Sequence, residues 1–415
     1  MAPSRLRFSR ERLAGLADAF VIAIAVSLPW STSATGILVA AWAAALFPVV
    51  DWSGLRRTIM TPAGGFPVVL VVLGIAGMLW ADVSLVERWK GLDSFLKLLA
   101  IPLLLVQFRA SDRGIWVFAG YLASCVVLLA ASTVVIAIPP LARSLLHVDY
   151  TLVKNGATQS GEFVTCIFGM LYLVVDAWER RDRARVIACA TIILAMLASI
   201  VFVATGRTAL LVALVLLVVF AIKRLSARGV LLLLVAVVVL GAIGWTSSPY
   251  LQQRTTAIWT DLERYKAEET VTSSGERLVF WKKSIDFISQ APVIGHGTGT
   301  IRSLFEKSAT GRSGAAGEIS TNPHNQTFAV GIQLGLIGIA ALWAMWIAHL
   351  MLFRGDGLAA WIGLTVVVQN FVGSLFNSHV FDFTQGWVYA IGVGVAGAMV
   401  YGQVEKSTRP AQSKH

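Results

Sequence analysis

Stretches of 17 or more nearly uncharged residues recur along most of this chain, and they limit what it can fold into. Each stretch can cross roughly 30 Å of hydrocarbon as a helix, which satisfies its own backbone hydrogen bonds. The chain is 56% hydrophobic and only 14% charged. We therefore predict an all-α, polytopic integral membrane protein. Twelve spans are expected, at about residues 14–29, 34–50, 65–81, 91–108, 114–137, 161–177, 186–204, 207–222, 229–246, 326–352, 357–377 and 384–402.

One long stretch, from Trp245 to His324, is too polar and too charged to lie in a bilayer. It divides the chain into four predicted parts. These are spans one to nine in residues 1–246, a large loop with amphipathic helices in 247–325, spans ten to twelve in 326–403 and a tail in 404–415. We expect the chemistry of the protein to lie in the large loop.

The distribution of Lys and Arg predicts the orientation of the spans. Nineteen of these residues fall on the side of the N-terminus, whereas the short loops opposite carry five, which are Arg88, Lys90, Arg143, Lys154 and Arg207. Because cytoplasmic loops retain positive charge, both termini are predicted to be cytoplasmic and the large loop exported. The net charge of +11 then reflects topology, and no nucleic-acid partner is expected.

Two arginines and a histidine stand out on the exported side. Arg277 follows a capping box, Ser273 to Glu276, in the first turn of a predicted helix, where free backbone amides favour an anion. Arg207 lies in a very short loop, where an unpaired charge facing lipid would cost several kcal/mol. His324 lies where the chain re-enters an apolar span. Taken singly, Arg277 also suits a solvated helix face, Arg207 a side chain that snorkels to the interface, and His324 a helix cap. Their occurrence together on one predicted face of the membrane indicates a functional site.

The helix that carries Arg277 is predicted to be amphipathic. Apolar residues recur on one face at Leu278, Trp281, Ile285 and Ile288. We expect this face to lie on the membrane or on the helix bundle, and Pro292 to end the helix. The glycines of the following turn, residues 295–299, permit a tight turn or a close approach of the backbone to another group.

In their order and topology, these motifs resemble the O-antigen ligase and O-antigen polymerase superfamily. The motifs are Thr205-Gly206-Arg207, Gly275-Glu276-Arg277 with Trp281 and Ile285, Pro292-x-x-Gly295-x-Gly297, and Pro323-His324-Asn325 followed by Gly331 and Gly335-x-x-Gly338. The resemblance covers roughly residues 200–340, and the twelve-span layout extends it over the whole chain. Chain length and the late large loop are most similar to the lipopolysaccharide ligase branch. A GT-C-like glycosyltransferase fold is implied.

The resemblance implies transfer of a glycan from undecaprenyl diphosphate to a sugar hydroxyl of lipid A-core, at the periplasmic face of a bacterial inner membrane. Arg207 and Arg277 would bind the diphosphate and stabilise its growing charge, because guanidinium groups match phosphate oxygens. His324 would accept the hydroxyl proton as general base. Direct displacement inverts the anomeric centre, so we expect an inverting, single-step reaction.

Four further residues, Arg88, Lys90, Arg143 and Asn325, are predicted to contribute to substrate binding, the basic ones by steering anionic sugars or phosphates. Solvated interfacial side chains and, for Asn325, a helix cap are the structural alternatives. No metal or other cofactor is expected. The carboxylates of Asp261-x-Glu263 have a spacing that can hold a divalent ion, but they lie in a mixed-charge run typical of a solvated helix.

Other function classes remain open at this stage. An O-antigen polymerase would use the same donor and the same general base with another lipid-linked glycan as acceptor, and a related ligase could glycosylate proteins. A transporter or flippase for lipid-linked sugars is the alternative from a different class. It is disfavoured because carboxylates near the middle of the predicted spans are almost absent and the arginines gather near one face.

Overall fold

The computed structural model describes residues 3–138, 140, 144, 152–204, 206–253, 255–256, 273–312 and 314–408. Within these ranges the regular elements are all helical, in agreement with the predicted all-α class. The first half contains α1 (Pro3–Ser27), α2 (Thr32–Leu46), α3 (Trp52–Ile59), α4 (Pro62–Gly77), α5 (Leu85–Leu96), η1 (Lys97–Leu99), α6 (Ala100–Gln107), α7 (Gly114–Ala137), α9 (Gly156–Glu179) and α10 (Arg183–Phe202). The second half contains α11 (Arg207–Arg224), α12 (Ala227–Ser247), α14 (Ser273–Gln290), α15 (Ile301–Ala309), η2 (Gly314–Gly317), α16 (Gln326–Leu352), α17 (Leu358–Ser374) and α18 (Phe383–Thr408).

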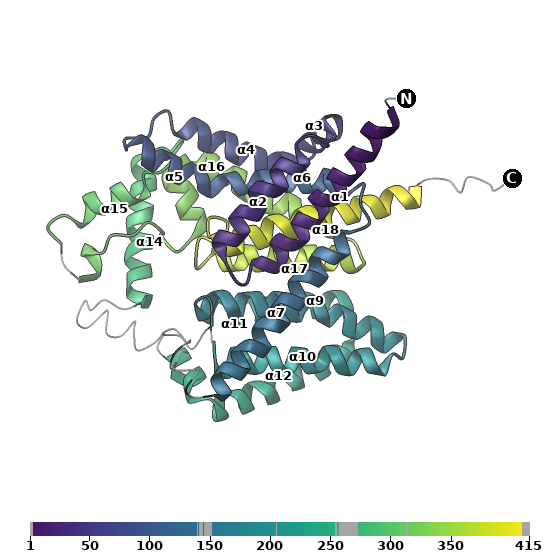
Figure 1. Cartoon of the computed structure of the whole chain (residues 1–415). Helices are drawn as coiled ribbons and strands as arrows, with labels where there is room; N and C mark the ends of the chain where they lie inside the picture. The colour runs from purple at the N-terminus through teal and green to yellow at the C-terminus, as the bar shows by residue number, and fades with distance from the viewer. Residues whose placement is uncertain are drawn as a thin grey trace.

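The helices form two groups that lie side by side (Figure 1). Helices α1–α6 and α16–α18 make one group, with α4 packed on α16 and α6 on α18. Helices α9–α12 make the other, and α17 joins the two by packing on α9, α11 and α18. Helices α14 and α15 lie at the end of the molecule opposite the two termini (Figure 1). We call the end that carries α14 and α15 the loop face.

The apolar helices make this a multi-pass membrane protein. Among the described residues, six helices are long and apolar enough to cross a membrane: α7, α9, α10, α12, α16 and α18. The bent pair α3 and α4, which meet at 87°, would make a seventh. All twelve predicted spans fall on helical segments, although the span predicted at 91–108 is divided among α5, η1 and α6. Helix α12 exposes apolar side chains such as Leu232 and Val238, each 70% accessible, as a lipid-facing helix does.

Helix α16 is interrupted at Gly335, whose φ of 61° and ψ of −158° are not helical. An interruption frees backbone groups that lipid cannot satisfy, so another part of the chain must bond them. The segment 292–297 does this. The hydrogen bonds run from His296 N to Ile332 O (2.9 Å), from Gly297 N to Gln333 O (2.9 Å) and from Leu336 N to Pro292 O (2.7 Å).

The predicted glycine turn also joins α16 to α4. Gly295, Gly297 and Gly299 all have positive φ, as a tight turn of this kind requires. Thr298 donates through its backbone N to Gly77 O (3.1 Å) and through Oγ1 to Gly74 O (2.6 Å), at the end of α4. The turn therefore fixes the position of α15, which begins two residues later at Ile301.

Candidate functional site

His324 lies directly before α16 in a backbone conformation that few residues adopt. Its φ is 53°, in the left-handed region that costs a non-glycine residue about 1 kcal/mol. Two side chains hold it there. Asn322 Oδ1 accepts a hydrogen bond from His324 N (2.8 Å), and Trp281 Nε1 of α14 donates to His324 O (3.4 Å). Backbone strain that neighbouring groups hold in place is common at functional sites, where a side chain must have one fixed orientation.

The imidazole ring of His324 is half-buried against α14. It stacks on Phe280, with ring centroids 6.2 Å apart and planes 13° apart. Burial lowers its pKa below the usual 6.5, the positive charge of Arg277 lowers it further, and interaction with the Asn377 side chain raises it. The ring is therefore neutral near pH 7, and its buried Nδ1 has no hydrogen-bond partner among the described residues.

The two predicted arginines lie near each other, each close to the start of a helix. Arg207 is the first residue of α11, and Arg277 lies in the second turn of α14. Burial lowers the pKa of Arg277, and the nearby charge of Arg207 lowers it further. Two guanidinium groups beside two helix N-termini concentrate positive potential, which an anion such as a phosphate would relieve.

A small cavity of about 70 Å³ opens beside Arg277, and we call it the arginine cavity. Its polar lining consists of Thr208, Arg277, Gln369, Asn377, His379 and Gln385, from α11, α14, α17, α18 and the α17–α18 turn. Burial lowers the pKa of His379 to about 4, so this second histidine is also neutral. The arginine cavity thus combines a cation with uncharged hydrogen-bonding groups.

Three side chains, Asn322, Asn377 and Ser378, form a hydrogen-bonded wall that carries His324. Asn322 Nδ2 donates to Asn377 Oδ1 (2.8 Å), and Ser378 Oγ donates to Asn322 Oδ1 (2.8 Å). The same Oδ1 accepts the backbone N–H of His324. The sequence analysis missed this wall. The sequence does contain a signal for this wall, because most of residues 377–382 are polar. These residues form the turn between α17 and α18, on the same face as His324.

The predicted substrate-binding residues have different surroundings. Arg88 donates to two backbone carbonyls, through Nε to Val83 O (3.0 Å) and through a terminal nitrogen to Met78 O (2.8 Å). Asn325 is the N-cap of α16, with Oδ1 accepting from Phe328 N (3.2 Å). Lys90 is exposed on α5 and lines a larger cavity at the loop face. Arg143, Asp261 and Glu263 lie outside the described residues.

Helix α14 buries aromatic side chains that lie outside the predicted apolar face. Leu278 and Ile285 are 43% and 55% exposed, whereas Phe280 and Phe287 are 5% and 6% exposed. Phe280 and Phe287 are buried because they pack on Phe305 of α15, and it stays a prediction that the apolar face with Leu278 and Ile285 lies on the membrane or on the bundle. This packing also brings Phe280 against the ring of His324.

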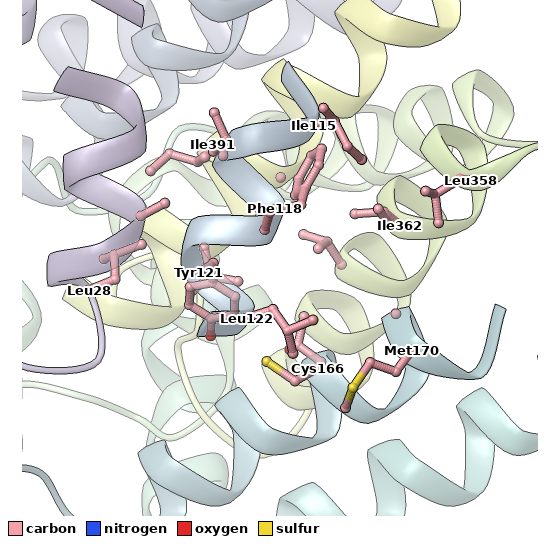
Figure 2. A pocket seen from close by; sticks show the side chains of 18 of the residues that line it. Leu28, Ile115, Phe118, Tyr121, Leu122, Cys166, Met170, Leu358, Ile362 and Ile391 are labelled. Carbon is pink, nitrogen blue, oxygen red and sulfur yellow. The ribbon is translucent and has the colours of Figure 1, made fainter. Parts of the chain in front are cut away.

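A second cavity, of about 360 Å³, is lined almost entirely by apolar side chains, and we call it the apolar cavity. Leu28 after α1, Phe118 of α7, Met170 of α9 and Ile391 of α18 point into it (Figure 2). It continues along the helices that line the arginine cavity. On α9, Gly161 and Val164 line the arginine cavity, and Thr165, Cys166 and Gly169 line the apolar cavity.

A buried ion pair lies near both cavities and was not predicted. Glu162 of α9 is 1% exposed, and its Oε1 lies 3.7 Å from Lys154 Nζ. Lys154 also donates to Thr384 Oγ1 (2.8 Å) and to the carbonyl of Leu28, so it joins the turn after α1 to α9 and α18. The sequence analysis treated Lys154 only as an exported charge because Leu28 and Thr384 are distant in sequence and periodicity does not show that Glu162 faces it.

The part of the chain that carries these residues is similar to a known family. Residues 192–343 match the family described as O-antigen ligase. The matched segment contains Arg207, Arg277 and His324, and this match confirms the resemblance recognised in the sequence at residues 200–340.

One curated protein is also similar to part of this chain. It is an uncharacterized protein of Haemophilus influenzae, 24% identical over 168 residues. The match covers 40% of this chain and 42% of the relative, so the chain matches less than half the length of that protein.

Proposed function

We propose that this protein is an O-antigen ligase. In this proposal it transfers a glycan from undecaprenyl diphosphate to a sugar hydroxyl of lipid A-core, at the periplasmic face of a bacterial inner membrane. One observation carries the proposal: Arg277 faces the charge of Arg207 and also lowers the pKa of a strained, half-buried His324. A cation pair beside a neutral imidazole suits displacement of a diphosphate by a hydroxyl.

The arginines act on the donor in the proposed reaction. Arg277 and Arg207 bind the diphosphate oxygens, with the helix N-termini of α11 and α14 adding partial positive charge. As the bond between the anomeric carbon and the diphosphate oxygen breaks, negative charge grows on the leaving group. Guanidinium groups that already face that charge stabilise it without reorganisation.

His324 acts on the acceptor. The acceptor hydroxyl oxygen attacks the anomeric carbon, and its proton passes to the neutral imidazole, which becomes imidazolium. Burial and Arg277 keep the pKa of His324 below 6.5, so the ring is ready to accept a proton at pH 7. The attack is a single displacement from the face opposite the diphosphate, with inversion, and no metal takes part.

The apolar cavity suits the isoprenoid chain of the donor. Its lining side chains are almost all hydrocarbon (Figure 2). It begins one turn along α9 from the arginine cavity. A lipid with its diphosphate at Arg277 would therefore have apolar surface directly beneath its headgroup. Thr165 and Gln369, which contact each other, lie at the junction of the two cavities.

The remaining features of the proposal follow from the sequence. The twelve helical segments would be twelve spans with a GT-C-like arrangement, and the loop face would be periplasmic. Arg88, Lys90, Arg143 and Asn325 would support substrate binding, Arg88 and Asn325 indirectly through the backbone groups that they hold.

An in vitro transfer assay tests the function. Purified protein is supplied with undecaprenyl-diphosphate glycan and rough lipopolysaccharide in EDTA, and products are separated by gel. We expect transfer that survives EDTA and falls at least a hundredfold in Arg207→Ala, Arg277→Ala and His324→Asn. Asparagine is chosen at position 324 because it tolerates a left-handed backbone, so that loss of activity is not loss of folding. Lys282→Ala, an exposed change elsewhere on α14, is the control.

The products distinguish the alternatives. Lipopolysaccharide that stays unmodified while the lipid-linked glycan lengthens would establish the polymerase reaction instead. If neither product forms but the lipid-linked glycan crosses a proteoliposome membrane, the protein is a transporter. Full activity in His324→Asn would reject the proposed general base.

A further inference from the structure

The loop face contains another cavity, of about 440 Å³, which is lined by Lys90 but not by Arg207, Arg277 or His324. We call it the lateral cavity. Its polar lining includes Glu87, Lys90 and Ser94 of α5, Arg302 of α15, Asn322 and Asp382. Apolar surface is contributed by Ile301, Ala329 and Phe381.

The lateral cavity and the arginine cavity lie on opposite sides of one wall. Asn322 and Ser378 line the lateral cavity, whereas Asn377 lines the arginine cavity, and these three side chains are hydrogen-bonded to one another. The backbone of His324 is bonded to Asn322 in this wall. The wall that holds the backbone of His324 therefore has the arginine cavity on one side and the larger lateral cavity on the other.

The lining of the lateral cavity suits a sugar with an anionic group. Amides, a hydroxyl and charges of both signs offer donors and acceptors, and Phe381 offers an apolar face for the carbon side of a pyranose ring. The two carboxylates are engaged in helix capping, Glu87 in the capping box of α5 and Asp382 by accepting from Gln385 N (2.8 Å).

The two cations of the lateral cavity are not equivalent. Arg302 pairs with Glu306 at 2.7 Å. Lys90 is exposed and makes no ion pair within the described part of the chain. Lys90 is therefore the group best placed to meet a phosphate or carboxylate on a sugar.

Helix α5 places the lateral cavity beside apolar surface. Leu85, Val86 and Trp89 on the same helix are 64%, 62% and 56% exposed. An exposed apolar strip on a short helix at the end of the bundle suits the membrane boundary, with Trp89 at headgroup level. A glycan that enters the lateral cavity could therefore remain attached to lipid chains in the bilayer.

We propose that the lateral cavity is the acceptor subsite and that it binds the anionic sugars of a membrane-anchored glycan, with Lys90 contacting the anionic group. The proposal rests on the proposed glycosyl transfer. In that reaction the diphosphate donor occupies the arginine cavity, the acceptor enters from the other side of the wall, and its hydroxyl reaches His324 over Asn322.

Photocross-linking tests the site without requiring turnover. A benzoylphenylalanine replaces Ser94 in the full-length His324→Asn protein, and radiolabelled rough lipopolysaccharide is the probe. A matched photoreactive residue replaces Lys282, which is exposed on α14 and does not line the lateral cavity. We expect cross-linking from position 94, none from position 282, and a severalfold loss at position 94 when Lys90→Glu is added.

Kinetics provide a second readout. Lys90→Glu should raise the KM for rough lipopolysaccharide about tenfold while leaving the KM for the lipid-linked donor unchanged, with Lys282→Glu as the charge-matched control. Phosphatase-treated lipopolysaccharide should show a smaller effect of Lys90→Glu.

The outcomes separate this proposal from the ligase function. Transfer by the wild type without cross-linking at position 94 would reject the lateral cavity and leave the ligase function standing. Cross-linking at position 94 without transfer would support acceptor binding there and reject the ligase reaction. Equal increases of both KM values in Lys90→Glu would also overturn the acceptor assignment.

Discussion

Replacement of Gly295 by alanine tests whether the inserted turn holds the broken helix α16 together. Gly295 has a φ of 70°, and an added Cβ would lie 2.4 Å from the carbonyl carbon of Gln333 and 2.5 Å from Leu334 N. These are backbone atoms of α16 and cannot move aside as a flexible side chain would. The turn must therefore withdraw from the interruption at Gly335.

The expected cost follows from the bonds that the turn makes. The left-handed conformation costs alanine about 1 kcal/mol. Withdrawal of the turn also breaks the bonds from His296 N to Ile332 O, from Gly297 N to Gln333 O and from Leu336 N to Pro292 O. A buried backbone group left unpaired costs about 1–3 kcal/mol. With partial rearrangement, we expect the free energy of unfolding to fall by about 3–6 kcal/mol.

Thermal unfolding in detergent, followed by tryptophan fluorescence, measures the effect. Gly295→Ala should lower the Tm by at least about 5 °C. Gly241→Ala in α12 is the control, because an added Cβ there meets no atom within 4 Å and alanine favours a helix. A Gly295→Ala protein that melts within about 1 °C of the wild type would show that the turn does not support α16.

Further predictions concern the histidines. The transfer rate should be constant near neutral pH and fall as pH drops through the pKa of His324, which lies below 6.5; a rate that falls already between pH 8 and 7 would contradict this. In NMR titrations with labelled histidine, Arg277→Gln should raise the pKa of His324 by removing a positive charge, whereas Asn377→Ala should lower it; shifts in the same direction would refute the assigned causes. His379, with a pKa of about 4, must stay neutral in the folded protein. Above pH 6.5 this histidine is neutral in both the folded and the unfolded protein. As pH falls from 6.5 toward 4, only the unfolded protein takes up the proton, so the free energy of unfolding decreases by about 3 kcal/mol in total. The Tm of His379→Gln should therefore depend less on pH in this range.

The sequence alone determined where the helices are and which residues belong to one face. Hydrophobic length is a local property, so each predicted span falls on a helical segment of the structure. The placement of Arg207, Arg277 and His324 on one face followed from the order of apolar and polar stretches. The sequence predicted that these three residues act together, but it could not show which side chains approach one another. Those approaches depend on how α11 and α14 pack.

Only the tertiary structure decided which groups surround those three residues. The α17–α18 turn reaches Asn322 across 55 positions of the chain, and this contact creates the wall between the two polar cavities. The burial of Phe280 and Phe287 on α14 was not predicted, because they pack on α15, a partner that helical periodicity does not specify. The interruption of α16 at Gly335 is stable because the turn at 292–297 bonds its free backbone groups. These features depend on pairing between distant segments, whereas hydropathy and helix signals report only on neighbours in the chain.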